Sequence, residues 1–294
     1  MKQTLFFTNP TDLSLCNKQL EIKMTDKDDT KKVFRCIEDI GCIIVDNHSV
    51  HITIPLLNEL VCRGVSVVFC NSNHFPTSML MNLDSNVLQA KHFREQIEMG
   101  TVIKKQIWKQ IIEAKIENQY RLLDKIGLQS SQLTAYSKNV KSGDSTNREG
   151  VAAKVYWKML LGRDFIRDRD GYPPNNLLNY GYSIIRSATI RALLGAGLYP
   201  LMGIFHRNYY NSFPLADDIM EPYRPFIDKK VYELYIAGEN KITKIVKQSL
   251  IEILYEDIEY DGLSMSLLTS ILRVSSNFLR MISGESKIMK YPKI

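Results

Sequence analysis

The sequence has 294 residues, of which 45% are apolar and 24% are charged, and its formal net charge is +6. This composition is typical of a soluble globular protein with a substantial core, and it excludes low-complexity classes. The longest uncharged run, residues 192–205, is too short to span a bilayer and contains Pro200. Because the start also lacks a signal-peptide pattern, we expect a cytoplasmic protein without membrane association.

The five cysteines all lie in the first quarter of the chain, and no two have CxxC spacing. An odd number without paired spacing argues against both a disulfide framework and a zinc site. Their neighbours are apolar, so the sequence predicts reduced, buried thiols. These residues are Cys16, Cys36, Cys42, Cys62 and Cys70.

The first 85 residues are rich in short runs of β-branched and aromatic side chains bounded by Gly, Asn and Asp. Such runs predict strands, and one apolar segment at residues 54–64, ending at Gly64, predicts a helix. We therefore expect a small β-rich, β-sandwich-like domain over residues 1–85. The predicted strands cover residues 2–8, 18–24, 32–37, 41–47 and 65–71.

From residue 86 onward the apolar spacing changes to three and four, as at Ile103, Ile107, Ile111 and Ala114, which is typical of helices. The polar stretch 137–150 predicts a loop, and no later segment shows strand alternation. The sequence thus predicts an α+β protein with a larger all-helical domain over residues 86–294. Its predicted helices cover residues 86–126, 150–161, 175–195, 216–237, 241–255 and 263–283.

Charge is unevenly distributed between the two predicted domains. Residues 1–85 carry 8 basic and 10 acidic groups, a net of −2, whereas the remainder carries 30 and 22, a net of +8. The excess is concentrated in residues 91–148, with 11 basic and 6 acidic groups. A polyanionic partner would therefore bind the second domain, although lysines on helices are also ordinary solvated surface.

Glu149 has a complete structural explanation of its own. Thr146 and Glu149 have the spacing of a capping box, in which the two side chains satisfy backbone N–H groups at a helix start. Taken alone, this residue is better explained by capping than by catalysis.

One histidine and three acids lie close together between residues 206 and 221. Asp218 and Glu221 are three residues apart and would face the same side of a helix, where their charges repel unless a cation lies between them. Arg224 could be that cation, and a divalent metal is the alternative, because Mg²⁺ and Mn²⁺ accept carboxylates and Mn²⁺ also accepts imidazole. His206 alone would more often be a core side chain, and Asp217 a favourable charge at a helix start.

Basic residues surround these acids in the sequence and are of the type that contacts phosphates. The candidate DNA-binding residues are Lys154, Lys158, Arg163, Arg167, Arg186, Arg207 and Arg224.

Four separated motifs occur in one order: REGVAAKVYW, RDGYPPNNLLNYGYSIIRS, GLYPLMGIFH and LADDIMEPYRPFID. Together they resemble the CRISPR-associated spacer-acquisition integrase and endonuclease family, and the MEPYRP variant and compact length are most similar to members from type II systems. The resemblance implies a catalytic metal site of Glu149, His206 and Glu221 that binds Mg²⁺ or Mn²⁺. It also implies an auxiliary acid at Asp218.

The resemblance further implies an activity and partners. A spacer's 3′-hydroxyl would attack a phosphodiester at the leader–repeat boundary of a CRISPR array, inserting short foreign DNA. Homodimers joined through residues 1–85 would flank a small CRISPR-associated acquisition protein, with prespacer DNA across the assembly. The type II effector nuclease and an accessory protein would be possible further partners.

Two other functions remain open from the residues themselves. The same three ligands could serve a metal-dependent, structure-specific DNA nuclease that does not join DNA. Alternatively, a non-catalytic DNA-bridging protein would use Glu149 only as a cap and Glu221 only as a partner of Arg224. The products formed from DNA, joined or merely cut, separate these hypotheses.

Overall fold

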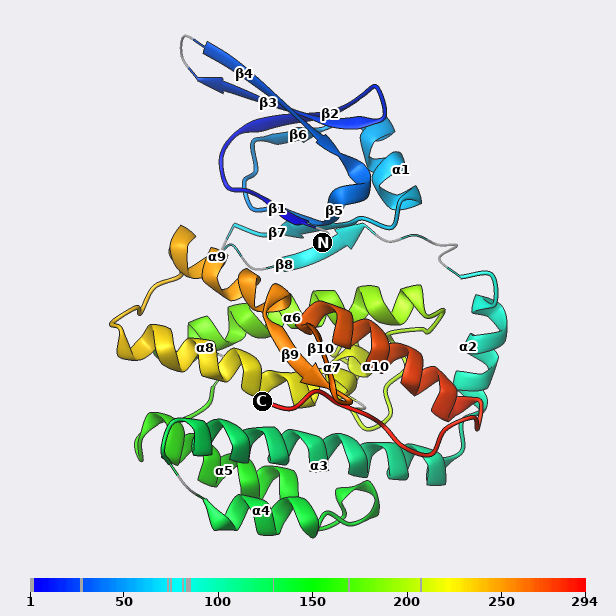
Figure 1. The fold of residues 1–294 in the computed structure, drawn as a ribbon, viewed down its shortest axis with the longest axis vertical. Coiled ribbons are helices and arrows are strands. Elements are labelled where there is room, and N and C mark those ends of the chain that lie inside the picture. The colour runs from blue at the N-terminus through cyan, green and yellow to red at the C-terminus, as the bar shows by residue number, and fades with distance from the viewer. Residues whose placement is uncertain are drawn as a thin grey trace. The chain divides into compact units, whose positions relative to one another are not determined.

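The computed structural model describes residues 3–26, 29–72, 74, 76–80, 82, 86–128, 130–168, 170–206 and 208–294. Its contacts divide the chain into two compact units, Met1–Ser85 and Asn86–Ile294. Figure 1 shows that the first unit is built mainly of strands and the second mainly of helices, so the predicted α+β class is confirmed.

Two four-stranded sheets and one helix form the first unit (Figure 1). In the first sheet, β1 pairs with β5 and β5 with β7 in parallel, and β8 closes the edge antiparallel to β7. Apolar side chains on these strands, such as Ile43 and Val67, are fully buried in the core of this unit. This sheet comprises β1 (Gln3–Phe7), β5 (Ile40–Val45), β7 (Ser66–Cys70) and β8 (Pro76–Leu80).

The second sheet is a meander of β2, β3 and β4, with β6 parallel to β2. Asn17 and Lys18 both have positive φ between β2 and β3, which is the backbone that a tight two-residue hairpin requires. Leu13 and Leu20 from this sheet share a core with Leu56 of α1 and with the first sheet. The elements are β2 (Thr11–Cys16), β3 (Gln19–Asp26), β4 (Asp29–Cys36), η1 (Ile37–Asp39), β6 (Val50–Ile52) and α1 (Ile54–Cys62).

The five predicted strands and the one predicted helix of this unit are present, but β2, β6 and β8 were not predicted. The expectation of buried cysteines is wrong. None of the five takes part in a disulfide and none is buried: Cys36 and Cys62 are exposed, and the other three are partly exposed. Cys36 is the last residue of the edge strand β4, and Cys62 is the last residue of α1. Apolar neighbours in the sequence do not reveal that these positions are exposed.

A 25-residue helix, α3, is the centre of the second unit. It packs against α4, α5 and α8 and against the 3₁₀ turns η2 and η3, and Figure 1 shows α4 and α5 along one side of it. Its buried face includes Ile107, Trp108 and Ile111. The elements of this half are α2 (Gln89–Glu98), α3 (Thr101–Lys125), α4 (Ser131–Lys138), η2 (Ser142–Asp144) and α5 (Arg148–Leu161).

The remaining helices pack on the other side of α3 (Figure 1). Gly181 allows α6 to approach α8, because a Cβ at this position would collide with Ile227. The elements are α6 (Asn175–Gly195), α7 (Pro214–Met220), η3 (Glu221–Tyr223), α8 (Arg224–Ile236), α9 (Lys244–Glu252), η4 (Ile253–Tyr255), β9 (Asp257–Tyr260), β10 (Leu263–Ser266) and α10 (Leu267–Ile282).

Three details of the second unit differ from the sequence prediction. An antiparallel hairpin, β9–β10, interrupts the helices, and its turn uses positive φ at Asp261 and Gly262. A helix that was not predicted, α4, lies between the predicted helix ending at residue 126 and the predicted loop over residues 137–150. The helix predicted over residues 216–237 is divided into α7, η3 and α8, because Pro222 and Pro225 lack the N–H that a continuous helix needs. Among the described helices, none is both long and apolar enough to cross a bilayer.

Candidate functional site

Glu149 lies in the first turn of α5, and two neighbouring side chains fix that turn. Asn147 is the N-cap and its Oδ1 accepts the N–H of Gly150 at 3.2 Å. The carboxylate of Asp144 accepts the N–H groups of Arg148 at 2.7 Å and of Glu149 at 3.0 Å. The predicted capping box of Thr146 and Glu149 is therefore wrong, since Asn147 and Asp144 satisfy these donors and leave the Glu149 side chain available.

Glu221 begins the 3₁₀ turn η3 and is almost completely buried. Asn118 of α3 holds this turn, because its Nδ2 donates to the carbonyl of Pro222 at 2.9 Å and to that of Pro292 at 3.0 Å. Arg224 Nη2 lies 3.0 Å from Glu221 Oε1, so the predicted pairing of these two residues exists. It accounts for only one of the two carboxylate oxygens.

Lys115 of α3 connects the two glutamates. Its Nζ lies 2.6 Å from Glu149 Oε1 and 2.6 Å from Glu221 Oε2. The contact with Oε2 is an ion pair without the angle of a hydrogen bond, so this buried oxygen has no aligned donor among the described residues. The two carboxylates, 72 positions apart in sequence, thus meet at one ammonium group.

Burial and charge oppose each other at this cluster. Burial lowers the pKa of Lys115, but the charges of Glu221 and Glu149 outweigh burial and raise it overall. Burial raises the pKa of Glu221, yet the charges of Arg224 and Lys115 outweigh it, and the net direction is downward. The cluster is therefore an ionised one at neutral pH, with two cations around the carboxylate of Glu221.

His206 is held by Asp218, which is completely buried. The Nδ1 of His206 lies 2.5 Å from Asp218 Oδ1, and the N–H groups of Ile204 and Phe205 donate to Oδ2 at 2.6 and 3.0 Å. This hydrogen bond to Asp218 is the largest cause of the raised pKa of His206, and the charge of Glu221 adds to it. With Nδ1 committed to a carboxylate, Nε2 is the ring nitrogen left for a ligand.

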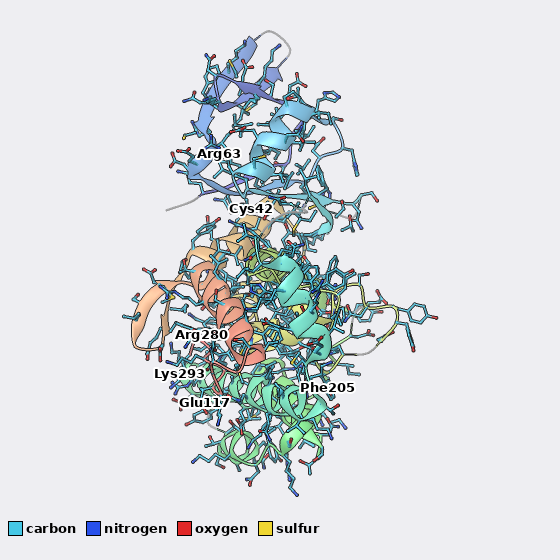
Figure 2. All side chains as sticks on the ribbon, turned by 90° about the vertical axis from the view of Figure 1, so that its right-hand side faces the viewer. Cys42, Arg63, Glu117, Phe205, Arg280 and Lys293 are labelled. Carbon is cyan, nitrogen blue, oxygen red and sulfur yellow. The ribbon has the colours of Figure 1, made fainter. Side chains whose placement is uncertain are left out.

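Aromatic packing orients the loop that carries His206. Phe205, labelled in Figure 2, stacks on Trp108 of α3 with ring centroids 4.3 Å apart. Trp108 also meets the ring of His206 edge-on at 5.8 Å. The same helix therefore positions the imidazole through Trp108 and the two glutamates through Lys115.

Asp217 and Asp228 are buried acids with structural partners. Asp217 pairs with Arg186 through Nε at 2.7 Å and through Nη2, and it also accepts from Asn211. Asp228 accepts from Tyr156 at 2.8 Å and from Tyr182, and burial raises its pKa to about 6. The ring of Tyr182 in turn lies under the guanidinium of Arg224 at 4.6 Å.

The seven candidate DNA-binding residues fall into separate groups. Lys154, Lys158 and Arg163 are exposed and make no ion pair within the described part of the chain. The other described members are engaged by groups of the protein: Arg167 donates to Asn175 and Asn179, Arg186 donates to Asp217, and Arg224 forms an ion pair with Glu221. Arg207 lies outside the described residues. The first group remains the better candidate for DNA contacts.

The chemistry of the implied metal ligands fits a hard divalent cation. Two carboxylates and an imidazole are a donor set for Mn²⁺, and carboxylates with water suit Mg²⁺. Glu221 Oε2 is a buried oxygen whose contact with Lys115 is an ion pair without an aligned hydrogen bond, so this oxygen retains acceptor capacity for a cation. As the side chains lie, the described residues contain no group of three His, Cys, Asp or Glu side chains that could hold an ion. The ammonium of Lys115 lies between the two glutamates.

Lys115, Asn118 and Asp144 were not predicted to serve the site. Lys115 carried one usable signal: it lies four residues after Ile111 and seven after Trp108, on the face of α3 that the apolar spacing predicts to be buried. A lysine on such a face requires an acidic partner. Asp144 and Asn118 act through backbone groups and carry no comparable signal.

The sequence profile described as CRISPR associated protein Cas1 matches residues 5–254. The chain belongs to this family. A protein named CRISPR-associated endonuclease Cas1 from Neisseria meningitidis serogroup C (strain 8013) is 34% identical over 297 residues, covering 99% of this chain and 96% of that protein. The predicted family is thereby confirmed.

Solved structures share the fold at lower identity. A casposase bound to its integration product has a TM-score of 0.82 at 20% identity, covering 98% of this chain and 92% of that one. A chain of a Cas6–RT–Cas1–Cas2 complex has a TM-score of 0.74 at 17% identity, covering 99% of this chain and 36% of that one.

Proposed function

We propose that this Cas1-family chain is a divalent-metal-dependent DNA integrase and endonuclease. It would insert short DNA duplexes into a CRISPR array by attack of a 3′-hydroxyl on a phosphodiester at the leader–repeat boundary. The observation that carries the proposal is the convergence of Glu149 and Glu221 on one point, with each carboxylate 2.6 Å from Lys115 Nζ. The related Neisseria protein is named an endonuclease, and the casposase with the same fold was solved with an integration product.

In this proposal, Glu149, Glu221 and Nε2 of His206 would hold Mg²⁺ or Mn²⁺. A bound divalent ion would supply charge neutralisation for the phosphoryl oxygens and orientation of the reacting oxygens. Asp218 holds the imidazole through Nδ1, so the neutral form of the ring would present an unprotonated Nε2 to the ion. Arg224 keeps Glu221 ionised, and the largely buried position of the cluster limits water.

The reaction itself is a transesterification that needs no covalent enzyme intermediate. A bond forms between the attacking 3′-oxygen and phosphorus while the bond to the leaving 3′-oxygen breaks, and the number of phosphodiesters is unchanged. Water in place of the 3′-hydroxyl would give hydrolysis, which accounts for endonuclease activity at the same site.

Partners follow from the same proposal. Lys154, Lys158 and Arg163 would contact the DNA, and residues 1–85 would form a homodimer. A small Cas2-type protein would bridge two dimers, in line with the Cas1–Cas2 complex that shares this fold. The type II affiliation, a role for its effector nuclease and accessory protein, and a cytoplasmic location belong to this proposal as well.

The test is a strand-transfer assay. Full-length protein and its small partner are incubated with labelled duplex bearing 3′-hydroxyl ends and a plasmid with leader and repeat, in Mg²⁺, in Mn²⁺ or in EDTA. We expect labelled plasmid with either metal but not with EDTA, and its loss in Glu149→Gln, Glu221→Gln and His206→Ala.

The matched control is Glu117→Gln, a glutamate on α3 that pairs with Arg121 (Figure 2); it should retain strand transfer. Cutting without joining would favour the nuclease hypothesis. Joining that survived in all three site variants would exclude the proposed ligands.

A further inference from the structure

Lys115 is a buried cation where the proposed function requires a metal. Only 9% of the residue is exposed, and its Nζ contacts Glu149 and Glu221 at the same distance of 2.6 Å. The second oxygen of Glu221 is 3.0 Å from Arg224. Each glutamate therefore turns one oxygen toward a single ammonium group.

An ammonium and a divalent ion cannot share this position. Mg²⁺ binds carboxylate oxygens at about 2.0–2.1 Å, shorter than the 2.6 Å contacts of Lys115. A cation bound by both oxygens would therefore lie in the space that Nζ occupies and would also repel its charge. Binding of the metal requires the ammonium to leave, which the flexible four-carbon side chain of lysine permits without movement of α3.

We propose that Lys115 is a displaceable internal cation that holds Glu149 and Glu221 together in the metal-free protein and competes with the divalent ion for them. The proposal rests on the proposed metal site. It gives Lys115 two effects: it prevents repulsion between the two carboxylates without metal, and it lowers the apparent affinity for metal. The second effect arises because only the fraction of molecules with the ammonium displaced can bind.

The alternative is that Lys115 only supports the structure. A supporting lysine would keep the carboxylates in place for the metal, so its removal would weaken metal binding. Competition predicts that removal of Lys115 strengthens metal binding. The change in the Kd for Mn²⁺, a fall or a rise, therefore distinguishes the two roles.

The experiment measures Mn²⁺ binding to metal-free, full-length protein by titration calorimetry without DNA. The Lys115→Met variant keeps the length of the side chain and removes its charge. We expect the apparent Kd to fall by about tenfold or more, within the common range for coupling between two sites. The same Mn²⁺ concentration should also raise the melting temperature more in the variant than in the wild type.

Lys109→Met is the matched control. Lys109 lies on the same helix, is partly exposed and is 3.6 Å from Glu113, so its removal should leave the Kd for Mn²⁺ unchanged. If Lys115→Met is unfolded without metal, Lys115→Gln, which retains amide donors for a carboxylate, replaces it in the same comparison.

An unchanged or higher Kd in the Lys115 variant would overturn the competition proposal alone, provided the wild type binds Mn²⁺. If neither protein binds Mn²⁺, the metal site of the proposed function fails, and the competition proposal fails with it. The two failures therefore give different results.

Discussion

Asp218 contributes to the site through His206. Its two oxygens accept the N–H groups of Ile204 and Phe205 and contact Nδ1 of the imidazole, and the residue has no exposed surface. A carboxylate surrounded by donors in this way has little capacity left for an ion. The geometry favours a positioning role, which gives a concrete form to the auxiliary acid that the family resemblance implies.

The Asp218→Asn variant tests this role. A carboxylate has two acceptor oxygens, but an amide has one oxygen and one NH₂ group, so the variant side chain could accept hydrogen bonds either from the backbone N–H groups or from the imidazole. If the NH₂ group faced Nδ1, that nitrogen would become the acceptor and the proton of the neutral ring would move to Nε2. We expect strand transfer and Mn²⁺ affinity to fall by about 10- to 100-fold.

Asp217→Asn is the control for Asp218→Asn, because the neighbouring acid pairs with Arg186 and, among the described residues, makes no hydrogen bond to His206. It should lower the melting temperature and leave Mn²⁺ affinity unchanged. Equal Mn²⁺ affinity in Asp218→Asn and the wild type would refute the positioning role.

Asp228 makes the stability of the second unit depend on pH. Burial raises its pKa from 3.8 to about 6, despite hydrogen bonds from Tyr182 and Tyr156 that lower it. Since the folded carboxyl keeps its proton to higher pH, its contribution to stability is complete below about pH 4 and is lost as the pH rises through about 6. Asp228→Asn does not titrate, so relative to the wild type it should gain roughly 3 kcal/mol between pH 4 and 7. Urea unfolding of both proteins at several pH values measures this difference, and a constant difference would contradict it.

At the level of elements, the sequence predicted the long helices well and the short strands and helix starts less well. The apolar spacing of α3, α6 and α10 is sufficient to identify them, because each buries a long face. Strands β2, β6 and β8 were missed, because β2 and β8 contain few β-branched or aromatic apolar residues and β6 has only three residues. The start of α5 was misjudged because Asn147 adopts a left-handed conformation that sequence spacing does not show.

The turn from Gly203 to His206 is the element that joins the imidazole to α7. A Cβ on Gly203 would lie 2.7 Å from the carbonyl oxygen of His206 and 2.8 Å from Pro214 Cβ, closer than such contacts allow. Gly203→Ala must therefore move the turn away from Asp218. We expect a reduction in strand transfer of at least about tenfold, by analogy with other misplaced supporting groups, together with a lower melting temperature.

Gly195→Ala is the matched control for Gly203→Ala. Gly195 ends α6, and an added Cβ there meets nothing within 4 Å, so the variant should retain activity and equal or slightly exceed the wild type in stability. Full strand transfer by Gly203→Ala would show that the turn tolerates displacement.

Across the whole molecule, the site combines segments that local sequence patterns cannot bring together. Lys115 and Glu149 are 34 residues apart and meet because α3 packs against α5, while Glu221 reaches them through η3. The spacing of His206, Asp218 and Glu221 raised a divalent metal as one alternative, but the full set with Glu149 came from the resemblance to a family. The position of Lys115 on the apolar face of α3 indicated that it needs an acidic partner, but which acids it meets depends on the packing of α3 against α5 and η3.

The charge difference between the two units makes a prediction about DNA binding. The first unit carries a net charge of −2 and the second +8, and the exposed Lys154 and Lys158 lie on α5, the helix that begins with the turn of Glu149. Their four-residue spacing places them on one face of that helix. Phosphate contacts from these lysines would release counterions, so DNA affinity of the full chain should fall steeply with salt.

Lys154→Ala should weaken duplex binding for any sequence and reduce the slope of log K against log salt by about one, measured by fluorescence anisotropy in EDTA. Lys31→Ala, an exposed lysine of the first unit, should change neither value. An equal loss in both variants would mean that DNA also contacts the first unit. In that case net charge would be a poor guide to the binding surface, because local exposed lysines would outweigh the negative balance of their unit.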